Sequence, residues 1–501
     1  MEEKNLYYKS TRGDKKRILS AEAIIKGIAN DGGLFVPETI PRADKDIYKL
    51  KNIDYKKLAF LIMRKFFTDY HQDELKDCIS QAYNNKFDTK IIAPLSKKMG
   101  VYFLELYHGP TLAFKDMALS MLPHLLTKAT RKLNLNQEIV ILTATSGDTG
   151  KAALEGFADI KGIKIIVFFP QKGVSEIQKK QMLTQKGENA YVIGIRGNFD
   201  DAQRGVKEIF EDPVFNEKLG EKNYILSSAN SINIGRLIPQ IVYYFYAYLN
   251  MLGEGGIKNG EKINIAVPTG NFGDILAAYY AKEMGLPVNK LICASNENRV
   301  LADFFNTGVY DKRRKLIMTI SPSMDILVSS NLERLLWTAS EREAQKVKEL
   351  INSLREKGYY RIGSEMKEKL KDFYGGFASQ EESRQSIKEI FEKSKYLTDP
   401  HTAAAYTVYK KYIKETGDMT KTVIVATASP FKFTKSVMES IDGRYKKSDD
   451  FELIEKISDL AQIPVPSGIR DIKKKPIRHK MVCEKEEMKA KIAEILDYLI
   501  S

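Results

Sequence analysis

Lys115 ends an apolar run, in a position where a neutral amine could do chemistry. Leu112, Ala113 and Phe114 directly precede it, and His108 lies nearby in the sequence. Burial among apolar neighbours would lower the pKa of the ammonium group, and the resulting neutral amine is a nucleophile toward an aldehyde. Most lysines in a chain with 79 Lys and Arg residues are solvated surface groups. The role of Lys115 therefore depends on which groups accompany it.

A glycine-containing turn at residues 267–274 could hold an anion. It follows an apolar run typical of a strand and precedes an alanine-rich helical pattern. Gly270 and Gly273 would let backbone amides approach a phosphate closely where the helix begins. The turn has neither the Gly-Lys-Ser/Thr of a Walker loop nor the spacing of a dinucleotide-binding fingerprint. Because strand-to-helix turns with glycine are common, a purely structural turn remains the alternative.

Two further turns are rich in hydroxyl groups. The turn at 143–150 carries more of them than helix capping requires, which favours a carboxylate pocket over a simple N-cap. At 426–430, Thr427 lies at a strand end, where it would either hydrogen-bond a ring nitrogen or cap the next helix. An amine, a phosphate cup, a carboxylate turn and a hydroxyl for a ring nitrogen are the four parts that a pyridoxal phosphate enzyme requires.

The composition predicts a folded, non-membrane protein. With 501 residues, 43% of them hydrophobic, the chain can form two or three domains with a sizeable core. No apolar stretch reaches the ~18 to 20 residues that a bilayer requires, and no apolar leader follows Met1, so we expect a cytoplasmic location and no membrane contact. Three cysteines without paired or ligand spacing favour neither disulfides nor a metal site.

The net charge of +14 suits nucleic acid, an anionic surface or small anionic substrates. Basic residues are spread among acidic ones along the whole chain, and the densest run, at 473–480, lacks the aromatic residues that stack on bases. We interpret this run as a solvated tail and expect no nucleic-acid partner. A small substrate that carries phosphate and carboxylate groups fits the charge.

Short β-branched runs, each followed by a turn and a helical pattern, recur from residue 138 onward and predict parallel sheets covered by helices. The runs lie at 138–145, 164–169, 191–195, 224–228, 262–267, 291–294 and 423–426. Residues 19–96 are mostly helical and look like a separate unit. Between 340 and 395 the pattern is charged and helical, with no strand before Val423, which predicts a helical insertion.

Segments along nearly the whole chain resemble the threonine synthase family, in the longer form found in fungi and many bacteria, among the fold type II (tryptophan-synthase-β-like) pyridoxal phosphate enzymes. They are 8–13, 31–37, 108–116, 145–150, 228–236, 268–274, 321–326, 399–402 and 426–430. The resemblance implies an α/β fold of two parallel-sheet three-layer domains, with an N-terminal mostly helical domain and a helical insertion. We expect an N-terminal domain at 1–96, a large cofactor-binding domain at 97–140 and 251–470 with the insertion at 340–395, a small domain at 141–250, and a C-terminal basic segment and helix at 471–501.

The resemblance also implies roles for particular residues. Lys115 would bind the aldehyde of pyridoxal 5'-phosphate as an imine, and Thr427 would face the pyridine nitrogen. The cofactor phosphate loop would be formed by Gly270, Asn271, Phe272, Gly273 and Asp274. The loop for the substrate carboxylate would contain Thr145, Ser146, Gly147, Asp148 and Thr149, with Asp148 where many relatives of the wider superfamily carry asparagine.

The substrate phosphate has three candidate ligands, Ser231, Asn233 and Arg236. Arg236 is favoured because a guanidinium group matches phosphate oxygens, whereas helix capping is the alternative for the other two. His401 lies in the family segment 399–402, and the sequence leaves open whether it acts or packs.

The implied reaction is that of a lyase acting on phosphate, which converts O-phospho-L-homoserine and water into L-threonine and phosphate by β,γ-elimination and replacement, the last step of threonine biosynthesis. A monomer or homodimer is expected. The closest alternative is a phospho-lyase on the same scaffold that gives 2-oxobutyrate. A second is an inactive descendant that binds nucleic acid or protein, which the intact Lys115 and anion loops disfavour.

Overall fold

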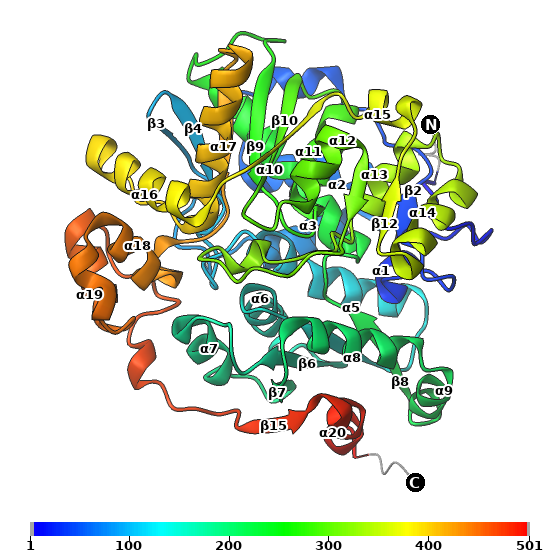
Figure 1. The fold of residues 1–501 in the computed structure, drawn as a ribbon. Helices are drawn as coiled ribbons and strands as arrows, with labels where there is room; N and C mark the ends of the chain where they lie inside the picture. The colour runs from blue at the N-terminus through cyan, green and yellow to red at the C-terminus, as the bar shows by residue number, and fades with distance from the viewer. Residues whose placement is uncertain (1–4, 498–501) are drawn as a thin grey trace.

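Two parallel sheets, each covered by helices, form the two halves of the molecule in this computed structural model, which describes residues 5–497 (Figure 1). The larger sheet has the order β13-β10-β9-β14-β4-β3 and the smaller one β15-β7-β6-β5-β8. Only β3 and β4 pair antiparallel in these two described sheets. The expected parallel α/β fold is therefore confirmed.

In the two sheets, β5 to β10 and β14 follow the predicted runs closely, whereas β3, β4, β13 and β15 were not predicted. The larger sheet contains β3 (Leu95–Lys98), β4 (Val101–Glu105), β9 (Ile263–Pro268), β10 (Val288–Ser295), β13 (Phe373–Phe377) and β14 (Thr422–Ala426). The smaller sheet contains β5 (Glu138–Ala144), β6 (Ile163–Pro170), β7 (Ala190–Arg196), β8 (Tyr224–Ser228) and β15 (Met481–Glu484).

Burial on both faces explains why the central strands are continuous apolar runs. Every residue of β9 and β14 is buried. In β14, Val423 and Val425 contact one hydrophobic cluster, whereas Ile424 contacts another on the opposite face. This alternation follows from the two-residue period of a strand.

The N-terminal unit combines helices with a small antiparallel strand pair. It contains β1 (Tyr8–Ser10), α1 (Ser20–Lys26), β2 (Phe35–Pro37), η1 (Lys45–Lys49), α2 (Tyr55–Met63) and α3 (Gln72–Ala82). The hydroxyl of Tyr8 donates to the carbonyl oxygen of Phe66 at 2.9 Å, which joins the strand pair to the helices.

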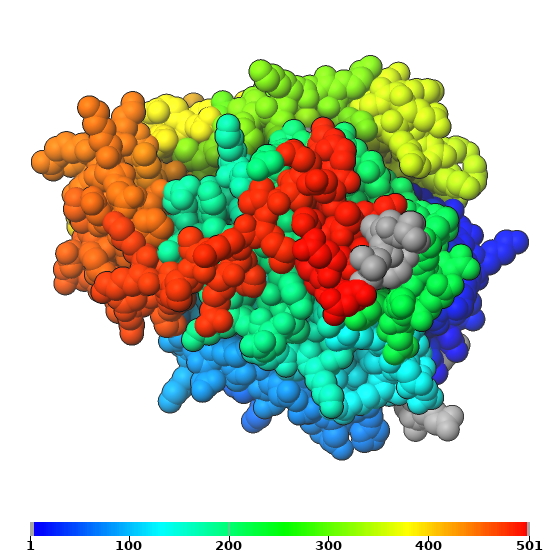
Figure 2. Space-filling model, turned by 90° about the horizontal axis from the view of Figure 1, so that it is seen from below, coloured from blue at the N-terminus to red at the C-terminus, as the bar shows by residue number. Residues whose placement is uncertain are grey.

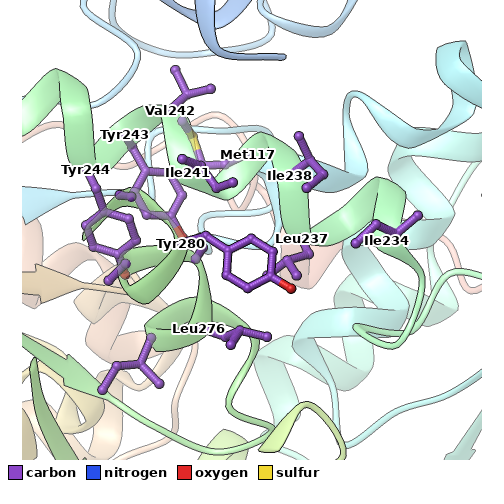
Figure 3. Packing of buried hydrophobic residues seen from close by; sticks show 14 of the residues in the cluster. Met117, Ile234, Leu237, Ile238, Ile241, Val242, Tyr243, Tyr244, Leu276 and Tyr280 are labelled. Carbon is purple, nitrogen blue, oxygen red and sulfur yellow. The ribbon is translucent and has the colours of Figure 1, made fainter. Parts of the chain in front are cut away.

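Most of the remaining helices lie outside the smaller unit. They are α4 (Asp116–Leu119), α5 (Leu122–Lys132), α10 (Ile234–Gly253), α11 (Gly273–Glu283), α12 (Val300–Thr307), α13 (Leu332–Ala339), α16 (Gln380–Ser394), α17 (Pro400–Thr416), α18 (Thr434–Ile441) and α19 (Glu452–Ala461), with the short helices η2 (Pro322–Met324), η3 (Pro430–Lys432), η4 (Gly443–Lys447) and η5 (Ile472–Lys474). Among them, α11, α12 and α17 contact strands of the larger sheet. Helix α10 packs against α11, α2 and α4, and Figure 3 shows its side chains beside those of α11. The predicted boundaries place most of α10 in the small domain; its main contacts are with α4 and α11 of the predicted large domain and with α2 of the N-terminal unit.

The region 340–395 contains strands as well as helices. Helices α14 (Ala344–Glu356) and α15 (Ser364–Lys369) flank β12 (Tyr359–Arg361), which pairs with β11 (Val309–Asp311). Strand β13 forms the edge of the larger sheet beside β10. The expectation of no strand here was wrong, because Gly375 and Gly376 weaken the strand pattern. A Cβ on Gly375 would lie 2.8 Å from the carbonyl oxygen of Ala302, so glycine is required for α12 to pack there.

The smaller sheet is covered by α6 (Asp148–Phe157), α7 (Glu176–Leu183), α8 (Phe199–Glu211) and α9 (Pro213–Glu221). The C-terminal segment runs across this unit (red in Figure 2), and its strand β15 pairs with β7. After η6 (Lys485–Glu487), α20 (Met488–Ile495) packs against α8. Within residues 5–497, no helix has the length and apolar character needed to cross a membrane.

Candidate active site

A pocket lies where β9 and β14 end and where α6 and α11 begin, between the two sheets. Its walls include Pro268 at the end of β9, Thr427 just after β14, Asp148 at the start of α6 and Gly273 at the start of α11. The carboxyl ends of parallel strands are where ligands bind in open α/β sheets.

The pocket brings together most of the residues singled out from the sequence. Those that line it are Lys115, Asp148, Thr149, Ser231, Arg236, Gly270, Asn271, Phe272, Gly273, Asp274 and Thr427. Thr145, Ser146, Gly147 and Asn233 are not among its lining residues. His401 lines it as well, together with Gln240, which the sequence did not indicate, and Ser323, which lies in the family segment 321–326 but had no predicted role.

Lys115 directly precedes α4, and its side chain is only 11% exposed. Its Nζ lies 4.7 Å from the centre of the Phe114 ring and 3.6 Å from Oδ2 of Asp148. Burial lowers the pKa of Lys115, and the positive charges of Lys432 and Arg236 lower it further. Attraction to Asp148 raises this pKa and so opposes these effects. The pocket therefore favours the neutral amine more than water does.

Backbone pairing brings Lys115 and Thr427 into the same site. The amide of Phe114 donates to the carbonyl oxygen of Thr427 at 2.8 Å, and the amide of Ser429 donates to that of Leu112 at 3.0 Å. An antiparallel bridge between Ala113 and Ala428 lies between these two bonds. The apolar run before Lys115 thus acts as a short strand partner for the turn after β14.

Hydrogen bonds from the segment before α13 hold the glycine turn after β9. Ser329 Oγ donates to the carbonyl oxygen of Gly270 at 2.7 Å, and the amide of Asn331 donates to that of Asn271 at 3.1 Å. Phe272 has a left-handed backbone (φ 65°), and its ring packs against Phe305, with centres 5.9 Å apart. The first amides of α11 have no acceptor within the helix, which makes this turn suited to a phosphate group.

Asp274 carries a half-satisfied carboxyl group. Its Oδ1 accepts hydrogen bonds from the hydroxyls of both Tyr243 and Tyr244 at 2.5 Å, whereas Oδ2 is buried without a partner in the described chain. Burial raises the pKa of Asp274 to about 6, although the two tyrosine hydrogen bonds act in the opposite direction. The two tyrosines are buried in the core and also support the candidate phosphate loop.

Asp148 is contacted from both units of the molecule. Its Oδ1 lies 2.6 Å from Nζ of Lys432 and accepts from Gln178 Nε2 at 2.7 Å, and its Oδ2 accepts from Ser323 Oγ at 3.1 Å. Burial would raise the pKa of Asp148, but the charges of Lys432 and Lys115 outweigh it and hold that pKa well below its usual range. Lys432, which is fully buried, was not singled out from the sequence.

Thr145 and Asn233 have structural roles. Thr145 Oγ1 accepts from the amides of Gly147 and Gly150 at 2.9 and 2.8 Å, so it closes the turn before α6. Asn233 caps α10, because its Oδ1 accepts from the Gly235 amide at 2.9 Å while its Nδ2 donates to Ile24 O at 2.9 Å. The capping alternative raised for Asn233 is therefore the arrangement found.

Arg236 is a buried cation with a free donor. The residue is 2% exposed, Nη1 donates to the carbonyl oxygen of Ala229 at 2.9 Å, and Nε has no hydrogen-bond partner in the described chain. Burial lowers the pKa of Arg236 to about 10. Within residues 5–497, no carboxylate forms a salt bridge with it. An unpaired guanidinium that lines a pocket is suited to an anionic ligand.

These residues fit pyridoxal 5'-phosphate. Lys115 would hold its aldehyde carbon, residues 270–274 its phosphate and Thr427 its ring nitrogen. Gly270 is required by the packing of the loop itself, because a Cβ there would lie 2.5 Å from the carbonyl oxygen of Ser323. The unpaired Arg236 leaves a second anion-binding position in the same pocket.

Three family models match the chain. Residues 7–83 match the threonine synthase N terminus, residues 87–428 match the pyridoxal-phosphate dependent enzymes, and residues 402–489 match the C-terminal part of threonine synthase. The second model alone covers more than half of the chain.

Individual proteins are similar over most of the chain. Threonine synthase from Saccharomyces cerevisiae is 37% identical over 467 residues, covering 87% of this chain and 89% of the yeast protein. Threonine synthase-like 1 from Macaca fascicularis is 42% identical over 434 residues, or 84% of this chain; the matched region spans only 58% of that relative. A crystal structure of PLP-bound threonine synthase from Brucella melitensis superimposes with a TM-score of 0.84 at 32% identity, covering 98% of each chain.

Proposed function

We propose that this chain, which belongs to the threonine synthase family of pyridoxal-phosphate-dependent enzymes, converts O-phospho-L-homoserine and water into L-threonine and phosphate in the Lys115 pocket. The observation that carries the proposal is the meeting of a buried amine with anion-binding groups in one pocket. Lys115, Arg236 and the turn at 270–274 all line it.

The cofactor and the protein divide the chemistry between them. When bound, pyridoxal phosphate supplies an aldehyde that combines with amines and a conjugated ring that stabilises negative charge at the adjacent carbon. Lys115 holds and moves protons: its neutral amine removes one from Cα of the substrate, releases that proton, and then removes one from Cβ, so that phosphate leaves from Cγ; the final step returns a proton to Cα. Water then adds at Cβ, after a proton has returned to Cγ.

The two anionic groups of the substrate are assigned to different walls of the pocket. Arg236 and Ser231 bind the phosphate, because the guanidinium has a free Nε donor. The turn that contains Ser146, Gly147 and Thr149 binds the carboxylate, at the start of α6, where helix amides point outward. Neutral Thr427 faces the ring nitrogen. The negative charge that develops during the reaction is then stabilised mainly by backbone amides and by bound phosphate.

The enzyme is further proposed to act in the cytoplasm as a monomer or homodimer.

A product assay tests the proposal. Purified protein loaded with pyridoxal phosphate is given O-phospho-L-homoserine, and threonine, 2-oxobutyrate and phosphate are measured together. Equal amounts of threonine and phosphate are expected, with none formed by Lys115→Ala. Phosphate with 2-oxobutyrate instead of threonine would identify the phospho-lyase, and no turnover of the substrate would refute both.

A further inference from the structure

Two lysines approach one carboxylate in the pocket, and they do so unequally. Lys432 Nζ lies 2.6 Å from Asp148 Oδ1 and donates to the carbonyl oxygen of Thr111 at 2.8 Å. Lys115 Nζ lies 3.6 Å from the other oxygen, Oδ2. The side chain of Lys432 is fully buried, whereas that of Lys115 is 11% exposed. Lys432 therefore forms the tighter ion pair.

The carboxylate is also well supplied with neutral donors. Gln178 Nε2 donates to Oδ1 at 2.7 Å, and Ser323 Oγ donates to Oδ2 at 3.1 Å. With Lys432 in place, Asp148 has one full positive charge and two hydrogen bonds before Lys115 is counted. Lys115 is then not needed as its counter-ion.

We infer that Lys432 is a positioning residue that acts as the resident counter-ion of Asp148 and so leaves the amine of Lys115 free to lose its proton. The inference rests on the proposed role of Lys115 as the reacting amine. Without Lys432, the nearest cation to Asp148 would be Lys115, and this pairing would favour its ammonium form.

The other charged groups around the three residues do not replace this effect. Arg236, on α10, is a further cation that disfavours a charged Lys115. Asp274, on α11, is engaged by Tyr243 and Tyr244 through Oδ1. The remaining acids and bases face their own partners: His401, on α17, bonds Asp399, and Asp116, on α4, accepts from Thr111 N and Oγ1 at 2.8 and 2.6 Å. Lys432 is thus the cation that neutralises Asp148.

Trace acetylation of the full-length, cofactor-free chain measures the protonation of Lys115 directly. Acetic anhydride reacts with neutral amines, so the acetylated fraction of the Lys115 peptide, followed by mass spectrometry against pH, gives the midpoint of its titration. In Lys432→Gln and Lys432→Met the midpoint is expected to rise by roughly one pH unit or more. The exposed Lys435 serves as the matched control, and Lys435→Gln should leave the midpoint unchanged.

Additional variants separate charge from damage to the fold. Adding Asp148→Asn to Lys432→Gln should return the midpoint to the original value or below it, because the pairing carboxylate is gone. Lys432→Arg keeps the positive charge, so the midpoint of its Lys115 titration should equal that of the original protein. This variant tests the inference if the neutral variants do not fold. An unchanged midpoint in the folded neutral variants, a rise that persists in the double variant, or a rise in Lys432→Arg would each overturn the inference.

This test is independent of turnover. Threonine formation with no shift of the midpoint would refute the role of Lys432 while leaving the proposed function intact. A shift of the midpoint in a protein that forms no threonine would support the role of Lys432 and refute the proposed function.

Discussion

Asp399 accepts a hydrogen bond from Nδ1 of His401 at 2.5 Å, in the interior of the protein. The amide of Ser323 donates to Nε2 of the same ring at 3.2 Å, so Nε2 is an acceptor and the ring proton lies on Nδ1. Both ring nitrogens are therefore engaged by the protein. His401 lines the pocket and also holds Ser323, whose carbonyl oxygen packs against Gly270.

Replacement of His401 by alanine is expected to lower the free energy of unfolding by about 1–3 kcal/mol. The amide of Ser323 and the carboxylate of Asp399 would each lose a buried partner. Urea denaturation of the two proteins measures the difference. An equal free energy of unfolding in the two proteins would show that the hydrogen bonds of the His401 ring do not stabilise the fold.

Lys115→Ala is expected to reduce turnover by at least about a thousandfold, since the amine that moves protons is removed. Borohydride reduction of the loaded protein followed by peptide mass spectrometry should find the cofactor attached to Lys115. Lys128, which is paired with Asp77 at 2.7 Å, is a control at which no attachment is expected. Cofactor attached to another lysine would refute the assignment.

Arg236→Ala should raise the KM for O-phospho-L-homoserine by roughly 10- to 100-fold, the effect of losing a charged hydrogen-bond donor to phosphate. Cofactor retention, followed by absorbance during dialysis, should change far less. The opposite pattern would place Arg236 at the cofactor phosphate instead of the substrate phosphate.

Gly270→Ala should destabilise the protein, because the new Cβ would lie 2.5 Å from the backbone oxygen of Ser323. Overpacking of this kind costs about 1–3 kcal/mol. Gly273→Ala is the matched control, since its Cβ would meet nothing closer than 3.4 Å. Thermal unfolding of both variants compares them, and an equal loss of Tm would contradict the prediction.

Asp274 should make the protein less stable as pH rises through about 6. Its folded pKa is raised above the ordinary value of 3.8 by burial, so the folded state holds a proton that the unfolded state has lost in this interval. Between pH 5 and pH 8 the loss from this group is about 1–1.5 kcal/mol. In Asp274→Asn this part of the pH dependence should vanish, as measured by urea unfolding at both pH values.

Much of the fold was predictable because its signals are local. The strand β14 is a β-branched run bounded by turns, and the loop at 270–274 has glycines where backbones approach closely. Strand β13 could not be found in this way, because its two glycines remove the β-branched pattern and its place depends on α12 and β10.

The site was predictable in its residue types but not in its electrostatics. Lys115 and Arg236 were singled out, and both line the pocket. Lys432 was not, since its effect depends on Asp148, which lies 284 positions away in the sequence and is brought near only by the fold. The tyrosines at Asp274 were hidden for the same reason, within an aromatic stretch of α10 that is also core.

The pairing of β15 with β7 has a consequence for how the molecule is made. Residues 481–484 supply the edge strand of a sheet whose other members lie between residues 138 and 228. On a ribosome, the first four strands emerge long before their fifth neighbour has been translated. Strand β7 then exposes an unpaired edge for most of synthesis, and we expect nascent chains to depend on chaperones until this last strand closes it.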